Sequence, residues 1–490
     1  MSIIIEQTPL YKFLPVGQDI IFTVSSDTIV ATKFNVKFVA RVYVSTELST
    51  LYDSSSIVAN LKVTPNNKGV AIFSLEPILS SYVNPLHTGV IYDGASFSIA
   101  SEFKNVAYSI DTPHPIHIID KYCNSKNNIR YFSIDFNIEY FNSATSNNRL
   151  SFLKYVKGLP YLFFNGVLDY NDPLQISDKM YGYNLNEPKL VLNNFYGSLG
   201  KFISNAPLEQ YARLEDYGTL SFFNWLNITD NGFQIGTDDA TKPAVKSVLF
   251  KLYNIANQLL ASIDVDCTHP NGGYFHPSDF SYTRLMFLGA FPANLDNWSS
   301  TWDLHKANIS YYNIQAYDDE DEPISQLYKI NIIDSSCKGF EPIRLTWLNQ
   351  WGTWDYYTFN KKSIKSLQTN RTNYTQQSGT WNNKVFEIHG YKGGKKNFRV
   401  NTKKLITVNT DFVKEEEALW FEDLINSTDV YILKGYNSAS NDFRTGIINK
   451  YVEPVTVTTS SYIRKTKAND KLIQYTFELE KTHNKRTQTV

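Results

Sequence analysis

One short segment brings together carboxylate, thiol and imidazole side chains and is the best candidate for a metal site in this chain. Asp264, Asp266 and Cys267 precede His269, and His276 follows a Gly-Gly turn able to fold it back toward His269. Carboxylate, thiolate and imidazole groups all ligate zinc. The spacing matches no regular zinc motif, so a loop with satisfied polar side chains is the simpler interpretation. We expect no bound transition metal here.

A second segment is rich in aromatic side chains suited to binding sugars. Trp347, Trp351 and Trp354 fall within eight positions, and Tyr356 follows them. Flat indole faces can stack on the CH faces of a sugar ring, so the segment is compatible with a glycan-binding platform. The alternative is structural, because large aromatic side chains also dominate cores and interfaces.

The structural interpretation of the aromatic segment is a β-hairpin. Its strands are expected over 344–348 and 354–359, with a turn over 349–353. In such a hairpin, alternate residues share one face, and these are core or subunit-contact positions: Trp347, Trp354, Tyr356 and Thr358.

The local motifs of common enzyme classes do not occur in the sequence. There is no GxGxxG, Walker A, GxSxG or HExxH pattern. The run from Tyr391 to Lys396 resembles a phosphate-binding loop, but we interpret it as a tight basic hairpin turn. His114 and His117 lie in a proline-containing segment that predicts a rigid loop. We therefore expect a protein that is not an enzyme, with no catalytic residues and no cofactor.

Composition places the chain among folded, sheet-rich proteins. Of its 490 residues, 42% are hydrophobic, 19% are charged and 15% are aromatic, which favours β-structure. The formal net charge is −1, so the chain as a whole lacks the basic field typical of nucleic-acid-binding proteins. Cys123, Cys267 and Cys337 are far apart, which predicts free thiols and no disulfide.

Alternating hydrophobicity predicts several short antiparallel strands in the first region. The clearest runs over 33–42, where Phe34, Val36, Phe38, Ala40 and Val42 share one face. Further strands are expected at 20–24, 59–63, 71–75 and 131–140. A turn over 65–69 is expected to connect the strands at 59–63 and 71–75. This spacing is typical of a β-sandwich.

The later regions continue the β-pattern with one helix. The middle region predicts strands at 161–164 and 219–223, and a hairpin over 248–265 in which a helix is the alternative. A helix is expected over 412–425 with Asp411 as its N-cap. A terminal hairpin over 455–479 offers a free strand edge to a neighbour, and a polar arm follows from 481 to 490.

The expected fold class is mainly β, with several antiparallel β-sandwich, Ig-like domains and one or two short helices. Three units are predicted: an N-terminal β-sandwich over 1–142, a middle β-rich domain over 143–338, and a C-terminal β domain over 339–490.

Particular runs of residues resemble virion proteins from tailed phages of Bacteroidetes, including crAss-like phages. The runs lie at both ends of the chain: 66–71, 80–83, 345–359, 407–410, 417–424, 430–431 and 471–476. This resemblance implies a structural component of the virion, made in the host bacterial cytoplasm and placed in the tail. It implies a ring of copies that bind one another and other tail or portal-proximal proteins. Apart from the resemblance, the sequence has no basic field and no apolar stretch long enough to span a membrane, so we expect neither direct sequence-specific binding of nucleic acid nor insertion into a membrane.

Three function classes follow from these observations. The leading one is a structural tail subunit, and the alternatives are a glycan- or receptor-binding tail protein and a carbohydrate-active enzyme. Burial of the aromatic side chains at a subunit contact favours the first, an exposed aromatic groove favours the second, and a groove that holds two carboxylates at glycosidase separation favours the third. The candidate core or interface residues are Trp347, Trp351, Trp354, Tyr356, Trp420, Tyr475 and Phe477.

Overall fold

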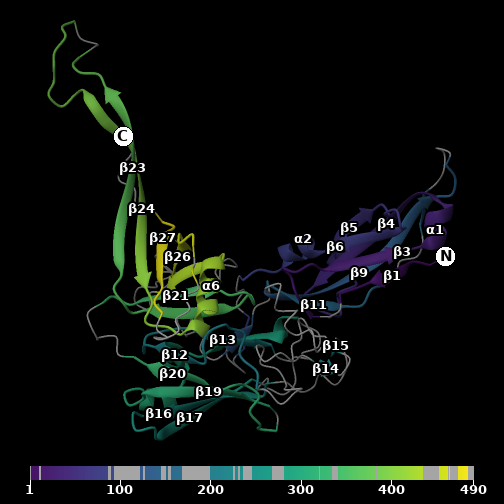
Figure 1. Ribbon diagram of the computed structural model, residues 1–490, viewed down its shortest axis with the longest axis horizontal. Coiled ribbons are helices and arrows are strands. Elements are labelled where there is room, and N and C mark those ends of the chain that lie inside the picture. The colour runs from purple at the N-terminus through teal and green to yellow at the C-terminus, as the bar shows by residue number, and fades with distance from the viewer. Residues whose placement is uncertain are drawn as a thin grey trace. The chain divides into compact units, whose positions relative to one another are not determined.

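The fold is known from a computed structural model of the full chain. It describes residues 2–9, 13–85, 90–92, 122–124, 127–144, 150–152, 156–167, 199–223, 227–229, 232–234, 245–267, 281–318, 320–333, 340–380, 384–433, 452–461, 463 and 473–483. The described part of the chain is mainly β, with 50% of its residues in strands and 13% in helices, arranged in several antiparallel or mixed sheets and a few short helices (Figure 1). The predicted mainly-β class is therefore confirmed.

Two sheets form the N-terminal part of the molecule. The first contains β1 (Ile4–Gln7), β3 (Ile21–Ser25) and β6 (Val70–Ser74), in the order β1-β3-β6. The second has the order β2-β11-β9-β4-β5, with β10 paired to β9. Its strands are β2 (Phe13–Pro15), β4 (Phe34–Ser45), β5 (Ile57–Val63), β9 (Ile129–Phe141), β10 (Leu150–Phe152) and β11 (Tyr161–Phe164).

The two sheets pack face to face around one hydrophobic core. Phe22 of β3 lies 6.1 Å from Phe136 of β9 between ring centroids, and Phe73 of β6 lies 5.6 Å from the same ring. The alternating apolar residues of β4, such as Phe38 and Val42, belong to the same core. The strands predicted in this region are confirmed, because burial of one face enforces the two-residue period.

The predicted turn over 65–69 connects strands of different sheets. Gly69 has a φ of +76°, and its amide donates to the carbonyl of Asn66, closing the turn. However, β5 pairs with β4 while β6 pairs with β3, so the chain crosses from one layer to the other here. The strand β11 also joins the second sheet through β9, and the boundary predicted at residue 142 cuts through this sheet.

Three further sheets follow. The five-stranded sheet has the order β12-β20-β19-β16-β17, formed by β12 (Glu209–Ala212), β16 (Ser247–Tyr253), β17 (Leu259–Asp266), β19 (Tyr311–Tyr317) and β20 (Tyr328–Ile332). The four-stranded sheet has the order β13-β18-β8-β7, formed by β7 (Val90–Tyr92), β8 (Tyr122–Asn124), β13 (Thr219–Phe223) and β18 (Leu285–Gly289). A two-stranded sheet joins β14 (Asn227–Thr229) to β15 (Gly232–Gln234).

The predicted hairpin over 248–265 is confirmed. Antiparallel β16 and β17 pair from Ser247↔Asp266 to Tyr253↔Leu259. Val248, Phe250 and Leu252 are buried on one face, so the two-residue period identified the strand correctly against the helical alternative.

Helices in this part of the chain are short. The α-helices are α1 (Asp27–Thr32), α2 (Glu76–Leu79), α4 (Pro292–Trp298) and α5 (Ser300–His305). The 3-10 helices are η1 (Ser54–Ser56), η2 (Ser80–Tyr82) and η6 (Ser281–Arg284). Among the described residues, no helix has the length and apolar character needed to cross a bilayer.

The C-terminal region is built on a seven-stranded sheet with the order β22-β21-β25-β26-β27-β24-β23. Its strands are β21 (Ile343–Leu348), β22 (Trp354–Phe359), β23 (Ile364–Gln376), β24 (Gly394–Asn409), β25 (Val430–Leu433), β26 (Val452–Val457) and β27 (Thr476–Lys481). The predicted hairpin of β21 and β22 is present. In Figure 1, β23 and β24 continue past the rest of this sheet as a two-stranded ribbon.

Two predictions for this region are wrong in detail. The helix begins later than expected, as η7 (Glu415–Glu417) followed by α6 (Ala418–Asn426). Asp411 does not cap it, because its carboxylate binds Lys361 at 2.8 Å and its amide donates to the Tyr357 hydroxyl.

The terminal strands also differ from the prediction. The partners β26 and β27 are central strands, since β25 flanks the first and β24 flanks the second. The free strand edge predicted for this hairpin is therefore absent. The predicted polar arm lies almost wholly outside the described residues.

The chain divides into two compact units that are discontinuous in sequence. Unit 1 comprises Met1–Ile333, Leu348–Asp355 and Gly435–Asn449. Unit 2 comprises Asp334–Trp347, Tyr356–Lys434 and Lys450–Val490.

Candidate functional site

The most unusual surface in unit 2 is the ribbon formed by β23 and β24. The two strands pair antiparallel from Ile364↔Thr407 to Gln376↔Gly394, with a bulge after Thr372. A third strand, β27, pairs only with Leu405–Asn409 at one end of β24. Beyond that point the ribbon has only two strands. We name residues 361–404 the arm.

Neither face of the arm is apolar. On one face Leu367, Thr369 and Arg371 stand opposite Lys404, Thr402 and Val400. On the other, Gln368, Asn370 and Thr372 stand opposite Lys403, Asn401 and Arg399. Every side chain from Ile364 to Asn373 is exposed. An isolated two-stranded ribbon is marginally stable in water, and this one has no core of its own to stabilise it.

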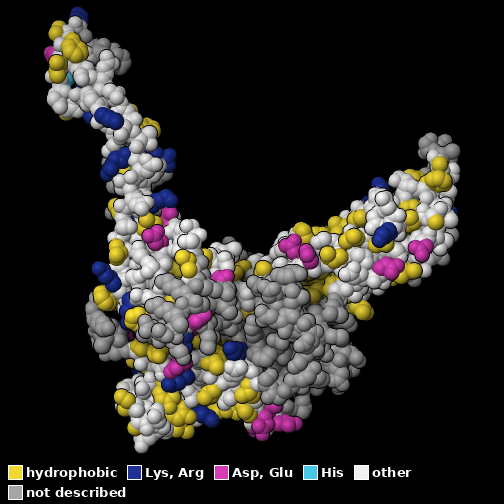
Figure 2. Space-filling view, in the orientation of Figure 1, with side chains coloured by type: hydrophobic (Ala, Val, Ile, Leu, Met, Phe, Trp, Pro, Cys, Tyr) yellow, Lys and Arg dark blue, Asp and Glu magenta, His cyan; other side chains and the backbone are white. Residues whose placement is uncertain are grey.

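The arm carries a concentrated positive charge. It contains eleven of the 47 Lys and Arg residues of the chain but one of its 48 Asp and Glu residues, Glu387, which gives the arm a formal net charge of +10. The remainder then holds 36 cationic and 47 anionic residues, a formal net charge of −11. Lys and Arg side chains line the arm in Figure 2. The net charge of the whole chain conceals this separation, whereas charge counted segment by segment reveals it.

Ion pairs on the arm lie near its two ends. At the base, Lys365 pairs with Glu341, and Lys403 lies 2.9 Å from Glu480. Near the tip, His389 lies 3.9 Å from Glu387. Between these ends, three exposed cations have no ion-pair partner among the described residues: Arg371, Lys395 and Arg399.

The tip of the arm exposes apolar side chains. Val385 and Phe386 are 66% and 62% exposed, and Ile388 and Tyr391 are 77% and 72% exposed. Thr380 orders this turn, since its hydroxyl donates to the carbonyl of Val385 and accepts from the amide of Glu387. The predicted basic turn from Tyr391 to Lys396 lies here, at the start of β24. Such a tip presents apolar contacts flanked by charge.

The seven predicted core or interface aromatics are all buried within the chain. Trp347, Trp354 and Phe477 are at most 2% exposed, and Trp351 is 6% exposed. The other three, Tyr356, Trp420 and Tyr475, are at most 5% exposed. Their faces are therefore closed to solvent, and none of them offers a stacking surface to a sugar.

In unit 2 these rings pack around Phe421 of α6. The Phe421 ring lies 5.2 Å from Trp420, 5.9 Å from Tyr475 and 5.7 Å from Phe477. Trp420 in turn lies 5.5 Å from Trp347 on β21. The aromatic residues thus join the helix to the sheet, which is a packing role.

The turn between β21 and β22 belongs to unit 1 and forms a buried polar network. The side chain of Asn349 accepts from the amides of Trp351 and Thr353 and donates to the carbonyl of Ile203. Its amide nitrogen also donates to Asp355, whose carboxylate accepts from the Ser204 hydroxyl at 2.5 Å. Since buried polar groups are costly unless hydrogen-bonded, this network specifies one conformation of the turn.

Gly352 is required in the same turn. Its φ is +72°, and a Cβ placed on it would lie 1.6 Å from the carbonyl oxygen of Asn165. On the neighbouring strand end, the amide of Val167 donates to the carbonyl of Gln350 at 2.7 Å. The turn therefore packs against backbone, and no larger residue fits.

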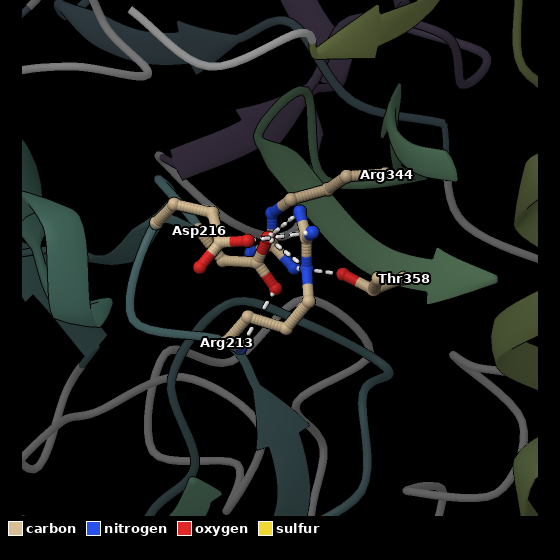
Figure 3. A network of polar contacts seen from close by, with 5 residues as sticks. Arg213, Asp216, Arg344 and Thr358 are labelled. Carbon is tan, nitrogen blue, oxygen red and sulfur yellow. Dashed lines mark hydrogen bonds and ion pairs between the residues drawn. The ribbon is translucent and has the colours of Figure 1, made fainter. Parts of the chain in front are cut away.

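Two arginines hold local structure, of which Arg213 is partly exposed and Arg344 is buried. In unit 1, Arg213 Nη2 lies 2.8 Å from Asp216 Oδ1, and the Arg213 amide donates to Oδ2 (Figure 3). In unit 2, Arg344 Nη1 donates to the Thr358 hydroxyl at 2.9 Å, and its guanidinium lies 5.4 Å from the Tyr356 ring (Figure 3). Both side chains are used within the fold, Arg213 in an ion pair with the buried carboxylate of Asp216 and Arg344 in a hydrogen bond and a ring contact.

Several tyrosines have their pKa raised by burial. Desolvation raises the pKa of Tyr328, which is fully buried and accepts a hydrogen bond from the amide of Phe202. Desolvation also raises the pKa of Tyr357, whose hydroxyl accepts from the Asp411 amide. Both groups are neutral at physiological pH and act as structural hydrogen-bonding groups.

The segment considered as a candidate metal site lies partly outside the described residues. Asp264 and Asp266 are exposed on β17, whereas Cys267 is buried and desolvation raises the pKa of its thiol. His269 and His276 lie outside the described residues, as do His114 and His117. Within the described part of the chain, no group of three or more His, Cys, Asp or Glu side chains is arranged to hold a metal ion.

Comparison with known proteins adds no family. No protein-family model matches the chain, and no curated protein matches its sequence.

Proposed function

We propose that this chain is a structural component of a tailed bacteriophage virion, a tail subunit assembled in a ring that binds neighbouring virion proteins. The observation that carries the proposal is the arm. It is a long ribbon with no apolar face, and three exposed cations along it lack an ion partner among the described residues. Extended elements of this kind gain stability by contact with another protein, since they bury little within their own chain.

The aromatic side chains support the same proposal. Burial of Trp347, Trp351 and Trp354 favours a packing role over a glycan platform. The resemblance of several segments to virion proteins of Bacteroidetes phages points to a place in the tail. For the N-terminal part we propose an Ig-like β-sandwich, supported by two mainly antiparallel sheets that share one core.

Electron microscopy tests the proposed function. The purified full-length protein should form closed rings with one copy number, and an antibody raised against it should label the tails of purified phage particles. A protein that stays monomeric at high concentration and does not label particles would contradict the proposal. Specific binding of the full-length protein on a glycan array would favour the receptor-binding alternative.

A further inference from the structure

We propose that the arm of one copy binds the acidic end of the five-stranded sheet of a second copy. This inference rests on the proposed function, and it names the surfaces that join neighbouring subunits.

Strand register places several carboxylates at one end of the five-stranded sheet. Ser247 at the start of β16 pairs with Asp266 at the end of β17 and with Tyr317 at the end of β19. The loop that follows Tyr317 is acidic and begins with Asp318. The acidic side chains described at this end of the sheet are Asp264, Asp266, Asp318, Glu320, Asp321 and Glu322.

Hydrogen bonds between the Asp318 side chain and backbone amides of the same loop fix the conformation of the acidic loop. The side chain of Asp318 accepts from the amides of Glu320 and Glu322, at 3.0 and 2.9 Å. Lys246 neutralises part of the charge through a 2.9 Å contact with Asp321. Glu320 and Glu322 are exposed, as is Asp264 on the neighbouring strand. A fixed loop of this kind offers carboxylates to a partner at little cost in conformational entropy.

The acidic end also has a free strand edge. β17 is the last strand of the sheet order, so among the described residues no strand pairs with its outer side. Unpaired edges accept strands from other chains. The arm is a ribbon whose outer strand, β23, is likewise the last of its sheet. Backbone pairing and charge attraction can therefore act at the same contact.

The division of charge identifies a second copy as the partner. The arm has a formal net charge of +10 and the rest of the chain −11, so two copies carry complementary surfaces without any third component. The paired part of the arm beyond β27 is about ten residues per strand, which extends roughly 33 Å. A contact between different surfaces of identical subunits is heterologous, and such contacts generate rings when the rotation closes.

Charge reversal with mutual rescue tests this contact. The arm variant carries Arg371→Glu, Lys395→Glu and Arg399→Glu, and the body variant carries Asp264→Lys, Glu320→Lys and Glu322→Lys. All six side chains are exposed, so both proteins should fold, which circular dichroism checks. A matched control carries Lys68→Glu, Lys157→Glu and Lys201→Glu, which changes the net charge as much as the arm variant does but leaves both proposed surfaces intact.

Sedimentation velocity of the full-length proteins gives the expected result. Wild type and control should self-associate, and raising the salt should weaken the association. Each reversed variant alone should associate at least about tenfold more weakly, and an equimolar mixture of the two should recover assembly, because their reversed charges are complementary.

Four outcomes would overturn the inference. An arm variant that assembles like wild type would rule out this contact but leave the proposed function unaffected. A mixture of two folded variants that fails to recover assembly would have the same consequence. Loss of binding to a 30-base-pair DNA duplex by the arm variant, with self-association unchanged, would identify a nucleic acid as the arm's partner. A wild-type protein that never self-associates would remove the proposed function and this contact together.

Discussion

Strands β9 and β23 have the same length and the same kind of pairing but opposite surroundings. Each has thirteen residues and pairs antiparallel with a long neighbour, β4 in one case and β24 in the other. Eleven residues of β9 are buried, whereas the first ten of β23 are exposed. Strands in the core and in the arm therefore have the same backbone hydrogen bonding. Their side chains determine whether a strand is buried in the core or exposed to solvent.

The largest expected difference between the core strand and the arm is in the stability lost when one aromatic side chain is truncated to alanine. Phe136→Ala on β9 should lower the free energy of unfolding by about 3–5 kcal/mol, because the side chain is fully buried between two sheets. The matched change in the arm, Phe398→Ala, removes a side chain that is 60% exposed and should change it by less than about 0.5 kcal/mol. Chemical denaturation measures both. Equal losses would show that the arm is part of a core.

One positive-φ glycine in the hairpin turn and one in the arm, Gly352 and Gly394, sharpen the comparison. Gly352→Ala should destabilise by at least about 2 kcal/mol, since the new Cβ would overlap a backbone carbonyl. Gly394→Ala places a Cβ in open space at a φ of +77°, so only the backbone cost of about 1 kcal/mol applies. Thermal unfolding of the two variants, compared with wild type, measures the difference. A Gly394→Ala protein as unstable as Gly352→Ala would contradict a free-standing arm.

The smallest expected effect is a loss of folding stability at high pH that is caused by one buried tyrosine. The pKa of Tyr328 is raised in the folded state, so its contribution to stability is complete below the ordinary pKa of about 10 and decreases as pH rises above it. One such group gives a slope of about 1.4 kcal/mol per pH unit. Urea unfolding from pH 8 to 11 should show this loss, and Tyr328→Phe should have a shallower slope. The same slope in both proteins would rule out Tyr328 as its source.

Whether a strand could be predicted from the sequence depends on whether it has an apolar face that packs in the core. β4 and β16 were predictable because one face packs in the core and gives alternating apolar residues, as in Val248, Phe250 and Leu252. β9 is buried on both faces but also alternates, because its second face carries polar residues such as Asp135 and Asn137. β23 has no buried face, and β24 buries only Ile406 and Val408 near its end, so the Thr, Asn, Gln and Lys residues of the arm leave no alternation to detect. The arm became recognisable only from its structure.

The helix and the terminal hairpin show two other limits of sequence reasoning. The apolar stripe of α6 located the helix and its end, but Asp411 looked like a cap because its competing partners, Tyr357 and Lys361, are distant in sequence. The terminal strands were identified, yet their neighbours were not, since strand order depends on contacts that no local pattern encodes.

The turn from Leu348 to Asp355 also bears on how the chain matures during synthesis. These residues belong to unit 1 but are translated after Asp334–Trp347, which belongs to unit 2. During synthesis, the carbonyl of Ile203 therefore cannot accept these hydrogen bonds until Asn349 and Thr353 have emerged from the ribosome. The first unit cannot finish folding before the second has begun to be made, and a nascent chain stopped at Ile333 would lack a buried piece of its own interior.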